Sequence, residues 1–371
     1  MVQPLKNWQE LGARIAEARK VSQLSQAELA TAVNLDRTAI TKLESGERKL
    51  DSLELVRIAG VLKRSVDWFL SRPLPAVVSR RKRRGTSDES KADALLDGVA
   101  RDVKLLVDMG LLSPPPAPQP VAVDSVETAE LAARDLRRQL ALPSGPVWDL
   151  LALAERLGCY AFCLDLRDES LDGSYLRLEA GGVAVVNGAM RSGRRRFTLA
   201  HELGHHLFAD DFSDEWIVGP DGEGRERLIN AFVIHLLMPR EACLSRWQAL
   251  DGRREPRAAA LALGAEFGVS WTAVLGHLRN LDLMDQRTHE RLRADHPTRA
   301  DYMEGGVTLR EELTPPAVPP RYAQTVIRAF KRHKLSGSRT LDLLHGVATA
   351  QDLPREDEVP LESMRAQFDL D

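Results

Sequence analysis

One stretch near the middle of the chain decides its fold and its chemistry: residues 201–205, which run His201-Glu202-Leu203-Gly204-His205. In a helix the two histidines lie one turn apart and about 40° apart around the axis, so both imidazoles can reach one metal ion. Glu202 points about 100° away from His201, outside the ligand pair but close enough to contact a water at the metal. This pattern is typical of a zinc-dependent hydrolase of the HExxH type, with His201 and His205 as metal ligands and Glu202 as general base.

A third ligand is expected, because catalytic zinc usually takes three protein ligands and leaves one position for water. Downstream, apolar residues at helical spacing predict a second helix packed on the first, with Glu226 and Asn230 on another of its faces. These apolar residues are Leu228, Ile229, Phe232, Val233, Leu236 and Leu237. We predict that Glu226 is the third ligand, with Glu223 and His235 as the alternatives.

The same region resembles the ImmA/IrrE family of metallopeptidases, from about residue 125 to residue 245. The resemblance rests on Arg196-Phe197-Thr198-Leu199-Ala200 before the histidine motif, on Asn230-Ala231-Phe232, and on Leu236-Leu237-Met238-Pro239. It implies an α+β zincin-like domain that hydrolyses peptide bonds with bound zinc, or with manganese in its place. In that family a Glu four residues before the Asn is the third ligand, which is Glu226 here.

This chain departs from the family pattern at Leu228 and Ile229, where Glu-Ala commonly precedes the Asn. The chemistry also needs a donor that stabilises the oxyanion, and the sequence does not single one out. The candidate donors are Tyr175, Arg227 and His235.

A second informative region, residues 8–70, consists of five short amphipathic segments with short breaks. Ser25-Gln26-Ala27-Glu28 has the form of a capping box, which predicts a helix that starts at Ser25. Asn34 suits a tight left-handed turn, Asp36 can cap the helix that follows, and Gly46 ends that helix.

Two short helices joined in this way resemble the helix-turn-helix of the XRE family of phage-repressor-like regulators. The segment Ile40-Thr41-Lys42-Leu43-Glu44-Ser45-Gly46 matches the pattern of that family closely. The resemblance implies an all-α domain whose third helix enters the major groove of operator DNA, commonly as a dimer on two half-sites. It places Arg37, Thr38 and Lys42 at base edges, Thr41 beside them and Gln26 near phosphate.

The charge distribution favours DNA as the partner of this region. Residues 1–84 carry 17 Lys and Arg against 9 Asp and Glu, a net charge of +8, whereas the whole chain has a net charge of −3. We therefore expect the basic N-terminal region to be the part that binds nucleic acid. The run Arg80-Arg81-Lys82-Arg83-Arg84 is either a solvated linker or an arm that contacts phosphate.

The composition, with 43% hydrophobic and 28% charged residues in a chain of 371, is typical of a soluble protein with two or three domains. There is no apolar run of the eighteen or so residues needed to cross a membrane, and no signal-peptide pattern, so we expect a cytoplasmic protein without a membrane partner. Three scattered cysteines, Cys159, Cys163 and Cys243, are expected to be buried and reduced.

We predict four parts. Residues 1–72 form the helix-turn-helix domain, and residues 73–124 are a linker that contains a helix at 91–112. Residues 125–245 form the metallopeptidase domain, with helices near 126–140 and 147–157 and strands at 160–164, 175–178 and 183–186. Residues 246–371 form a helical C-terminal region whose end is expected to be mobile.

The two resemblances together predict a DNA-binding transcriptional regulator whose zinc endopeptidase domain cleaves a repressor of the helix-turn-helix type. Such cleavage would derepress stress, phage or mobile-element genes. The competing hypothesis is a non-catalytic regulator or antitoxin-like repressor whose peptidase fold senses a ligand or partner. Glu202 favours catalysis, because a sensor needs no general base. A third hypothesis is a peptidase whose N-terminal domain recognises only protein partners.

Overall fold

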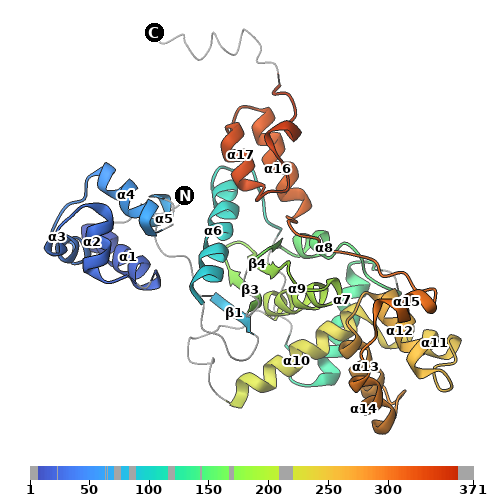
Figure 1. Cartoon of the computed structure of the whole chain (residues 1–371). Helices are drawn as coiled ribbons and strands as arrows, with labels where there is room; N and C mark the ends of the chain where they lie inside the picture. Colours follow the sequence, from blue (N-terminus) through green and yellow to red (C-terminus); the bar gives the residue numbers. More distant parts are fainter. Residues whose placement is uncertain are drawn as a thin grey trace. The chain divides into compact units, whose positions relative to one another are not determined.

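The computed structural model describes residues 7–22, 24–62, 64, 66–70, 77–82, 89–115, 122–142, 144–166, 171–208 and 220–357. For residues 21, 67, 77–82, 89–94 and 220–223 it describes the backbone alone. The chain divides into two compact units, one of residues 1–75 with 88–111 and one of residues 76–87 with 112–371. Figure 1 labels the elements of both units. Within the described ranges, no helix on its own combines the length and the apolar character that a membrane crossing requires.

The first unit begins with five short helices around one small core. They are α1 (Trp8–Val21), α2 (Gln26–Val33), α3 (Arg37–Glu44), α4 (Ser52–Leu62) and α5 (Val66–Leu70), and the long helix α6 (Glu89–Asp108) also belongs to this unit. The apolar positions of the five helices meet in one cluster, which includes Leu11, Ile15, Leu29, Val33, Ile40, Leu43, Ile58 and Phe69. The five amphipathic segments expected from the sequence are therefore confirmed as helices.

The turn between α2 and α3 is built largely as the sequence predicts. Ser25 and Glu28 form both hydrogen bonds of a capping box, and Asn34 takes the left-handed conformation with φ 58° and ψ 49°. Asp36 stands at the N-cap of α3, but its side chain makes no capping hydrogen bond, so the prediction that Asp36 caps this helix is wrong in that respect.

The second unit is built on a four-stranded mixed sheet with the order β1-β3-β4-β2. Its strands are β1 (Val77–Lys82), β2 (Cys159–Leu164), β3 (Leu171–Arg177) and β4 (Gly182–Asn187). Strands β2 and β4 run parallel, with Phe162 opposite Val185, and β3 runs antiparallel to both β4 and β1. All residues of β2 and β4 are buried, as expected for strands that are covered on both faces.

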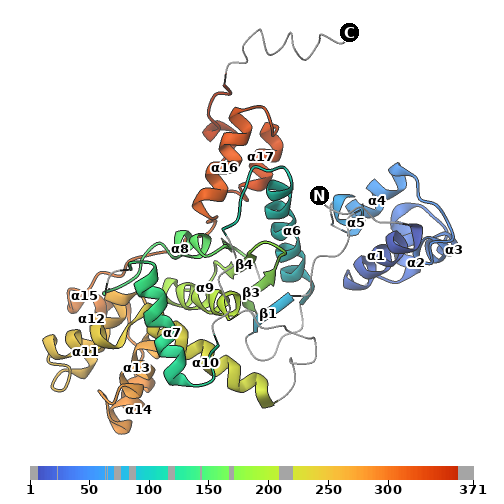
Figure 2. The same ribbon diagram turned by 180° about the vertical axis from the view of Figure 1, so that it is seen from behind.

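Helices pack on this sheet and on one another. The helix α9 (Ser192–Leu207) contacts β3 and β4, and α10 (Pro220–Leu237) packs on α9. The helix α7 (Val126–Gln139) lies along α10, as Figure 2 shows from behind, and α8 (Leu150–Arg156) contacts β2. A continuous core joins these elements through residues such as Ala133, Leu153, Ala184, Leu203, Ile229 and Phe232.

Seven further helices follow the sheet region. They are α11 (Arg240–Ala249), α12 (Pro256–Phe267), α13 (Trp271–Asn280), α14 (Gln286–Ala294), α15 (Arg299–Glu304), α16 (Pro320–Lys331) and α17 (Gly337–Leu343), before a single 3₁₀ turn, η2 (Ala350–Asp352). Between α15 and α16 the chain returns to the sheet, where Ala317 pairs with Cys163 in an isolated antiparallel bridge. Within the described residues, the helical character expected of residues 246–371 is confirmed in α12 to α17.

One part of the predicted linker is not a linker. Residues 77–82 form β1 at the edge of the sheet, whereas the sequence predicts a linker over 73–124 with a helix at 91–112. Val77 and Val78 suit a strand, and the basic residues that follow are common at sheet edges, where charge discourages pairing with other chains. The helix expected at 91–112 is α6, and the C-terminal residues 358–371 lie outside the described residues.

Candidate functional site

The two motif histidines lie side by side on the buried face of α9. His201 is 1% exposed and His205 is 6% exposed. Their ring centroids are 4.9 Å apart, and their Nε2 atoms are 3.2 Å apart. Both imidazoles therefore present the same nitrogen to one point, as the four-residue spacing predicts.

Glu226 reaches the histidines from α10 because α9 and α10 pack closely. A Cβ on Gly204 would lie 2.8 Å from Ile229 Cγ2, so only glycine lets α10 approach α9 this closely at the motif. The Ile229 side chain packs against Gly204. The Glu226 oxygens then lie 3.1 Å from His201 Nε2 and 3.3 Å from His205 Nε2.

These three side chains form a donor set that fits a metal ion. A tetrahedral zinc ion with bonds of about 2.0–2.1 Å holds neighbouring ligand atoms about 3.3 Å apart. The separations observed between donor atoms are 3.1, 3.2 and 3.3 Å. Within the described residues, His201, His205 and Glu226 are the one group of at least three such side chains whose donor atoms are close enough to share an ion.

The two histidines hold Glu226 in its ionised form, and Asn230 orients the ring of His201. Burial tends to raise the pKa of Glu226, but hydrogen bonds and charge from His201 and His205 outweigh it, so the pKa lies well below its usual range. His201 Nδ1 donates to Asn230 Oδ1 at 3.2 Å, which fixes the ring so that Nε2 faces Glu226. Asn230 thus orients the His201 ring, a role that the sequence analysis does not assign to it.

Glu202 lies on α9 against β3 and is fully buried. A Cβ on Gly173 of β3 would lie 3.2 Å from Glu202 Oε1 and 2.5 Å from Thr198 Cγ2. The helix that carries Glu202 can rest this close to β3 only because residue 173 has no side chain. We did not predict a role for Gly173, although a glycine inside a strand is a recognised sign of close approach.

The other candidates for ligand or oxyanion donor lie outside the donor group, although Arg227 and His235 line the same cleft as His205 and Glu226. Tyr175 is buried, and its hydroxyl lies 2.7 Å from Nδ1 of His206, whose Nε2 donates to Leu157 O. His235 lies 3.5 Å from Glu130, outside the donor group, and Arg227 is exposed on α10. The side chain of Glu223, the other alternative ligand, lies outside the described residues.

In the first unit, α3 carries four of the five residues predicted to contact DNA, and Thr41 is exposed like the other three. Arg37, Thr38 and Lys42 are exposed. Gln26 and Thr41 are joined by a hydrogen bond of 3.1 Å from the Thr41 hydroxyl to Gln26 Oε1. Gln26 also donates to Glu44 Oε2 at 2.8 Å, so it braces α2 against α3.

Comparison with known protein families now gives two matches. A family described as helix-turn-helix matches residues 15–69, and a family described as the IrrE N-terminal-like domain matches residues 154–278. The chain is a fusion of these two domains. No curated protein matches it.

The IrrE-like domain contains β2, β3, β4, α9 and α10, and therefore the three donors and Glu202. The site also uses residues beyond the matched range. A cleft of about 3100 Å³ is lined by His205, Glu226 and Asn230 and also by residues 307–311. We call residues 307–313 the strap, because they run from α15 towards the sheet.

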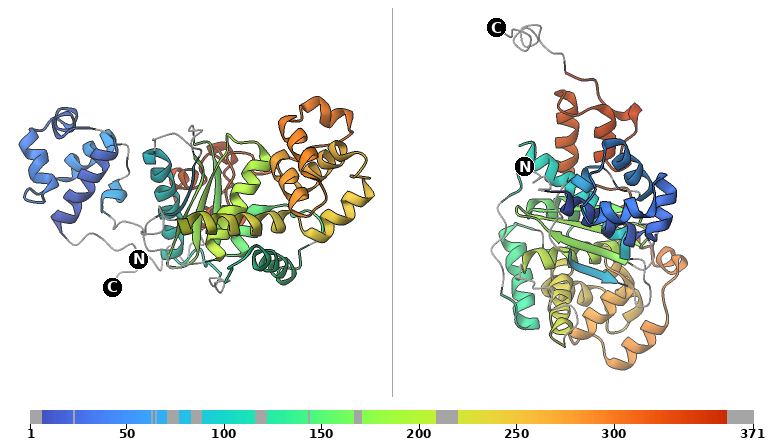
Figure 3. Two further views of the ribbon diagram at one scale, coloured as in Figure 1. Left: turned by 90° about the horizontal axis from the view of Figure 1, so that it is seen from below. Right: turned by 90° about the vertical axis from the view of Figure 1, so that its left-hand side faces the viewer.

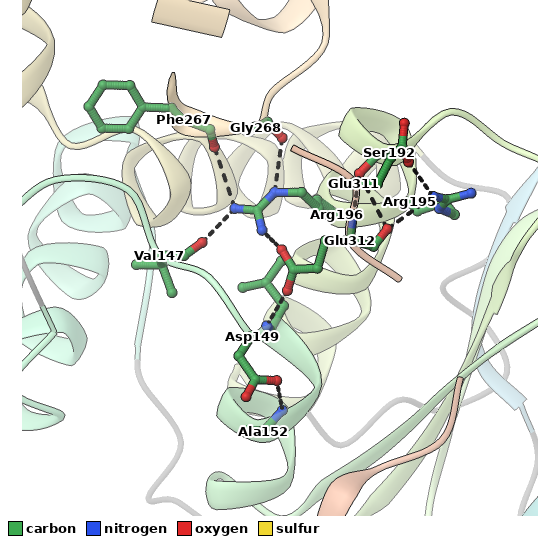
Figure 4. A network of polar contacts seen from close by, with 11 residues as sticks. Val147, Asp149, Ala152, Ser192, Arg195, Arg196, Phe267, Gly268, Glu311 and Glu312 are labelled. Atoms are coloured by element: carbon green, nitrogen blue, oxygen red, sulfur yellow. Dashed lines mark hydrogen bonds and ion pairs between the residues drawn. The ribbon is translucent and has the colours of Figure 1, made fainter. Parts of the chain in front are cut away.

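Figure 4 shows how the strap is held against the first turns of α9. Arg195 donates to Glu311 Oε2 at 3.0 Å, and Ser192 Oγ accepts from the Glu312 amide at 3.0 Å. Arg196 forms an ion pair with Glu312 and donates to the carbonyl oxygens of Val147 and Gly268. The IrrE-like domain thus depends on a segment outside the family match to hold its motif helix.

Proposed function

We propose that the IrrE-like domain is a zinc-dependent endopeptidase and that the helix-turn-helix domain binds operator DNA. The substrate that we propose is a repressor protein of the helix-turn-helix type, whose cleavage would derepress the genes it controls. The observation that carries the proposal is the convergence of His201, His205 and Glu226 within 4.8 Å, with Glu202 on the same helix.

In this mechanism His201, His205 and Glu226 hold the ion, and Asn230 keeps the His201 ring in its orientation. When bound, zinc supplies Lewis acidity towards water and towards the scissile carbonyl. Glu202 takes a proton from the attacking water and passes it to the leaving amine. Gly173 keeps β3 close to the Glu202 carboxylate, which limits the access of bulk water from that side.

The DNA-binding part of the proposal rests on the surface of α3. Arg37 and Lys42 are exposed there, on a segment whose net charge is positive. Both side chains can donate to guanine in the major groove. A DNA-binding domain on the same chain would raise the local concentration of the peptidase at an operator where a repressor sits, which is the reason for proposing a repressor as substrate.

The deciding experiment compares the wild type with Glu202→Gln and with Glu241→Gln, a control that alters an exposed glutamate on α11. Metal content is measured for each protein, and each is incubated with zinc or manganese and a helix-turn-helix repressor encoded beside this gene. We expect equal metal in all three proteins, equal cleavage by the wild type and the control, and a loss of about 10²–10⁴-fold in Glu202→Gln.

Other outcomes separate the alternatives. Metal bound by all three proteins without any cleavage would favour the non-catalytic sensor over the peptidase. A wild type that binds no metal would remove the basis of the proposed site.

A further inference from the structure

The edge strand β1 comes from the segment between the two matched domains, and it belongs to neither match. Its backbone pairs antiparallel with β3 from Val77 to Lys82 (Figure 3). Without β1, the sheet would end at β3, whose outer backbone groups would then be free to pair with another strand.

The β3 strand lies close to Glu202, the proposed general base. In the β1–β3 register Arg81 lies opposite Gly173, the residue whose missing side chain makes room for Glu202 Oε1. Paired strands are about 4.8 Å apart, so the backbone of β1 runs within one strand spacing of the residue that touches Glu202. An extended peptide in this place would lie beside the catalytic carboxylate.

Extended peptides bind many proteins by adding a strand to an open sheet edge. Here that place is taken by a strand of the same chain. We propose that β1 is an internal competitor, which occupies the edge where a substrate peptide pairs and must leave before that peptide binds. This inference rests on the proposed peptidase function, and it adds that the site takes extended segments similar to 77–82.

The register of the β1–β3 pairing is irregular, as expected of a strand that can dissociate from the sheet. The register shifts between Val77 and Ser79 and again between Arg81 and Lys82, so two irregularities fall within six residues. Each such shift leaves ladder groups unpaired and weakens the pairing. The pairing between β3 and β4, by contrast, runs without a shift from Gly173 to Arg177.

The test uses the full chain and two matched double variants. In one, Arg80 and Arg81 are both replaced by proline, which removes two amide donors and breaks the β1 ladder. In the other, both are replaced by alanine, which removes the same charges but keeps the amides. We expect hydrogen exchange of the outward β3 amides, within Leu171–Arg177, to rise at least about tenfold in the proline variant only. The amides of β4 should stay protected in all proteins, which shows that the fold is intact.

A second readout uses a fluorescent peptide copy of residues 76–87. We expect it to bind the proline variant at least about tenfold more tightly than the wild type or the alanine variant, because only the proline variant has an open edge. Equal exchange and equal peptide binding in the three proteins would overturn the proposal.

Measuring cleavage of the repressor distinguishes failure of the internal-competitor proposal from failure of the proposed peptidase function. If the proline variant binds the peptide tightly while no protein cleaves the repressor, the proposal that β1 is an internal competitor is supported and the proposed peptidase function is wrong. If all three proteins cleave the repressor at the same rate and bind the peptide equally, the peptidase function stands and the internal strand is wrong.

Discussion

Arg196, which immediately precedes Phe197 in α9, is completely buried and forms an ion pair with Glu312 of the strap. Burial and, to a lesser extent, the charge of Arg310 lower the pKa of Arg196 to about 9, so the guanidinium stays charged at neutral pH. The Glu312 carboxylate also accepts from the Leu150 amide at 2.6 Å. The motif helix is thus tied to α8 and to the strap through one carboxylate.

Replacing Glu312 by alanine should therefore destabilise the IrrE-like domain by about 3–5 kcal/mol, because it leaves a buried guanidinium without its counter-charge. The control is Glu311→Ala. The Glu311 side chain also pairs with an arginine of α9 but is 66% exposed, so its removal should change stability by less than about 1 kcal/mol. Urea unfolding of the three proteins measures both changes. Equal effects of the two substitutions would contradict the role given to Glu312.

Replacing Asn230 by alanine should weaken metal binding about 10–100-fold without abolishing it, because His201 loses the acceptor that fixes its ring. Competition with a chromophoric chelator measures the affinity. Arg227→Ala, an exposed change on the same helix, is the control and should leave the affinity unchanged. An Asn230→Ala variant with wild-type affinity would show that the contact does not position the ligand.

Replacing Arg37 or Lys42 by alanine should weaken binding to a duplex that carries the promoter of this gene by about 1–3 kcal/mol each, since both are exposed on α3. Arg57→Ala, on the exposed side of α4, should have little effect. Titrations at several salt concentrations separate base contacts from phosphate contacts, because loss of a phosphate contact lowers the salt dependence. A larger loss of DNA affinity in Arg57→Ala than in the α3 variants would indicate that α4, and not α3, contacts the DNA.

His277 gives the IrrE-like domain a component of acid sensitivity. It is 1% exposed, its ring lies 4.8 Å from that of His235, and Glu130 and Arg240 are nearby. Burial, with a further contribution from His235, lowers the pKa of His277 from 6.5 to about 3. Below pH 6.5, His277 is therefore protonated in the unfolded chain but stays neutral in the folded chain. Stability is lost as the pH falls from 6.5 towards 3.

Between pH 8 and pH 5 this residue should account for a loss of about 2 kcal/mol in the free energy of unfolding. The loss in the free energy of unfolding between pH 8 and pH 5 should therefore be about 2 kcal/mol smaller in His277→Phe than in the wild type. Measurements in the presence of EDTA remove the separate effect of acid on metal binding. The exposed residue His296 supplies the control, His296→Gln, which should follow the wild type. Parallel curves for wild type and His277→Phe would show that another group causes the acid sensitivity.

Much of this architecture follows from local patterns in the sequence. The spacing of His201 and His205, the apolar periodicity around Glu226 and the capping box at Ser25 each act within one or two helical turns. Helical geometry converts such short-range patterns directly into positions in space. For that reason the motif helix, the third donor and the helices of the helix-turn-helix domain could be predicted before any tertiary contact was known.

Three features depended on contacts between residues far apart in the chain, and no local pattern names the partner in any of them. Gly173 matters because α9 presses Glu202 against β3, β1 matters because an interdomain segment pairs with that same strand, and Glu312 matters because the strap returns to Arg196. The sequence by itself determined that His201 and His205 share one side of a helix and that Arg37 and Lys42 share another helix, since spacing along a helix sets the direction of side chains. Only the tertiary structure decided what lies against the general base and the motif helix, because close packing and strand pairing join residues that the sequence keeps apart.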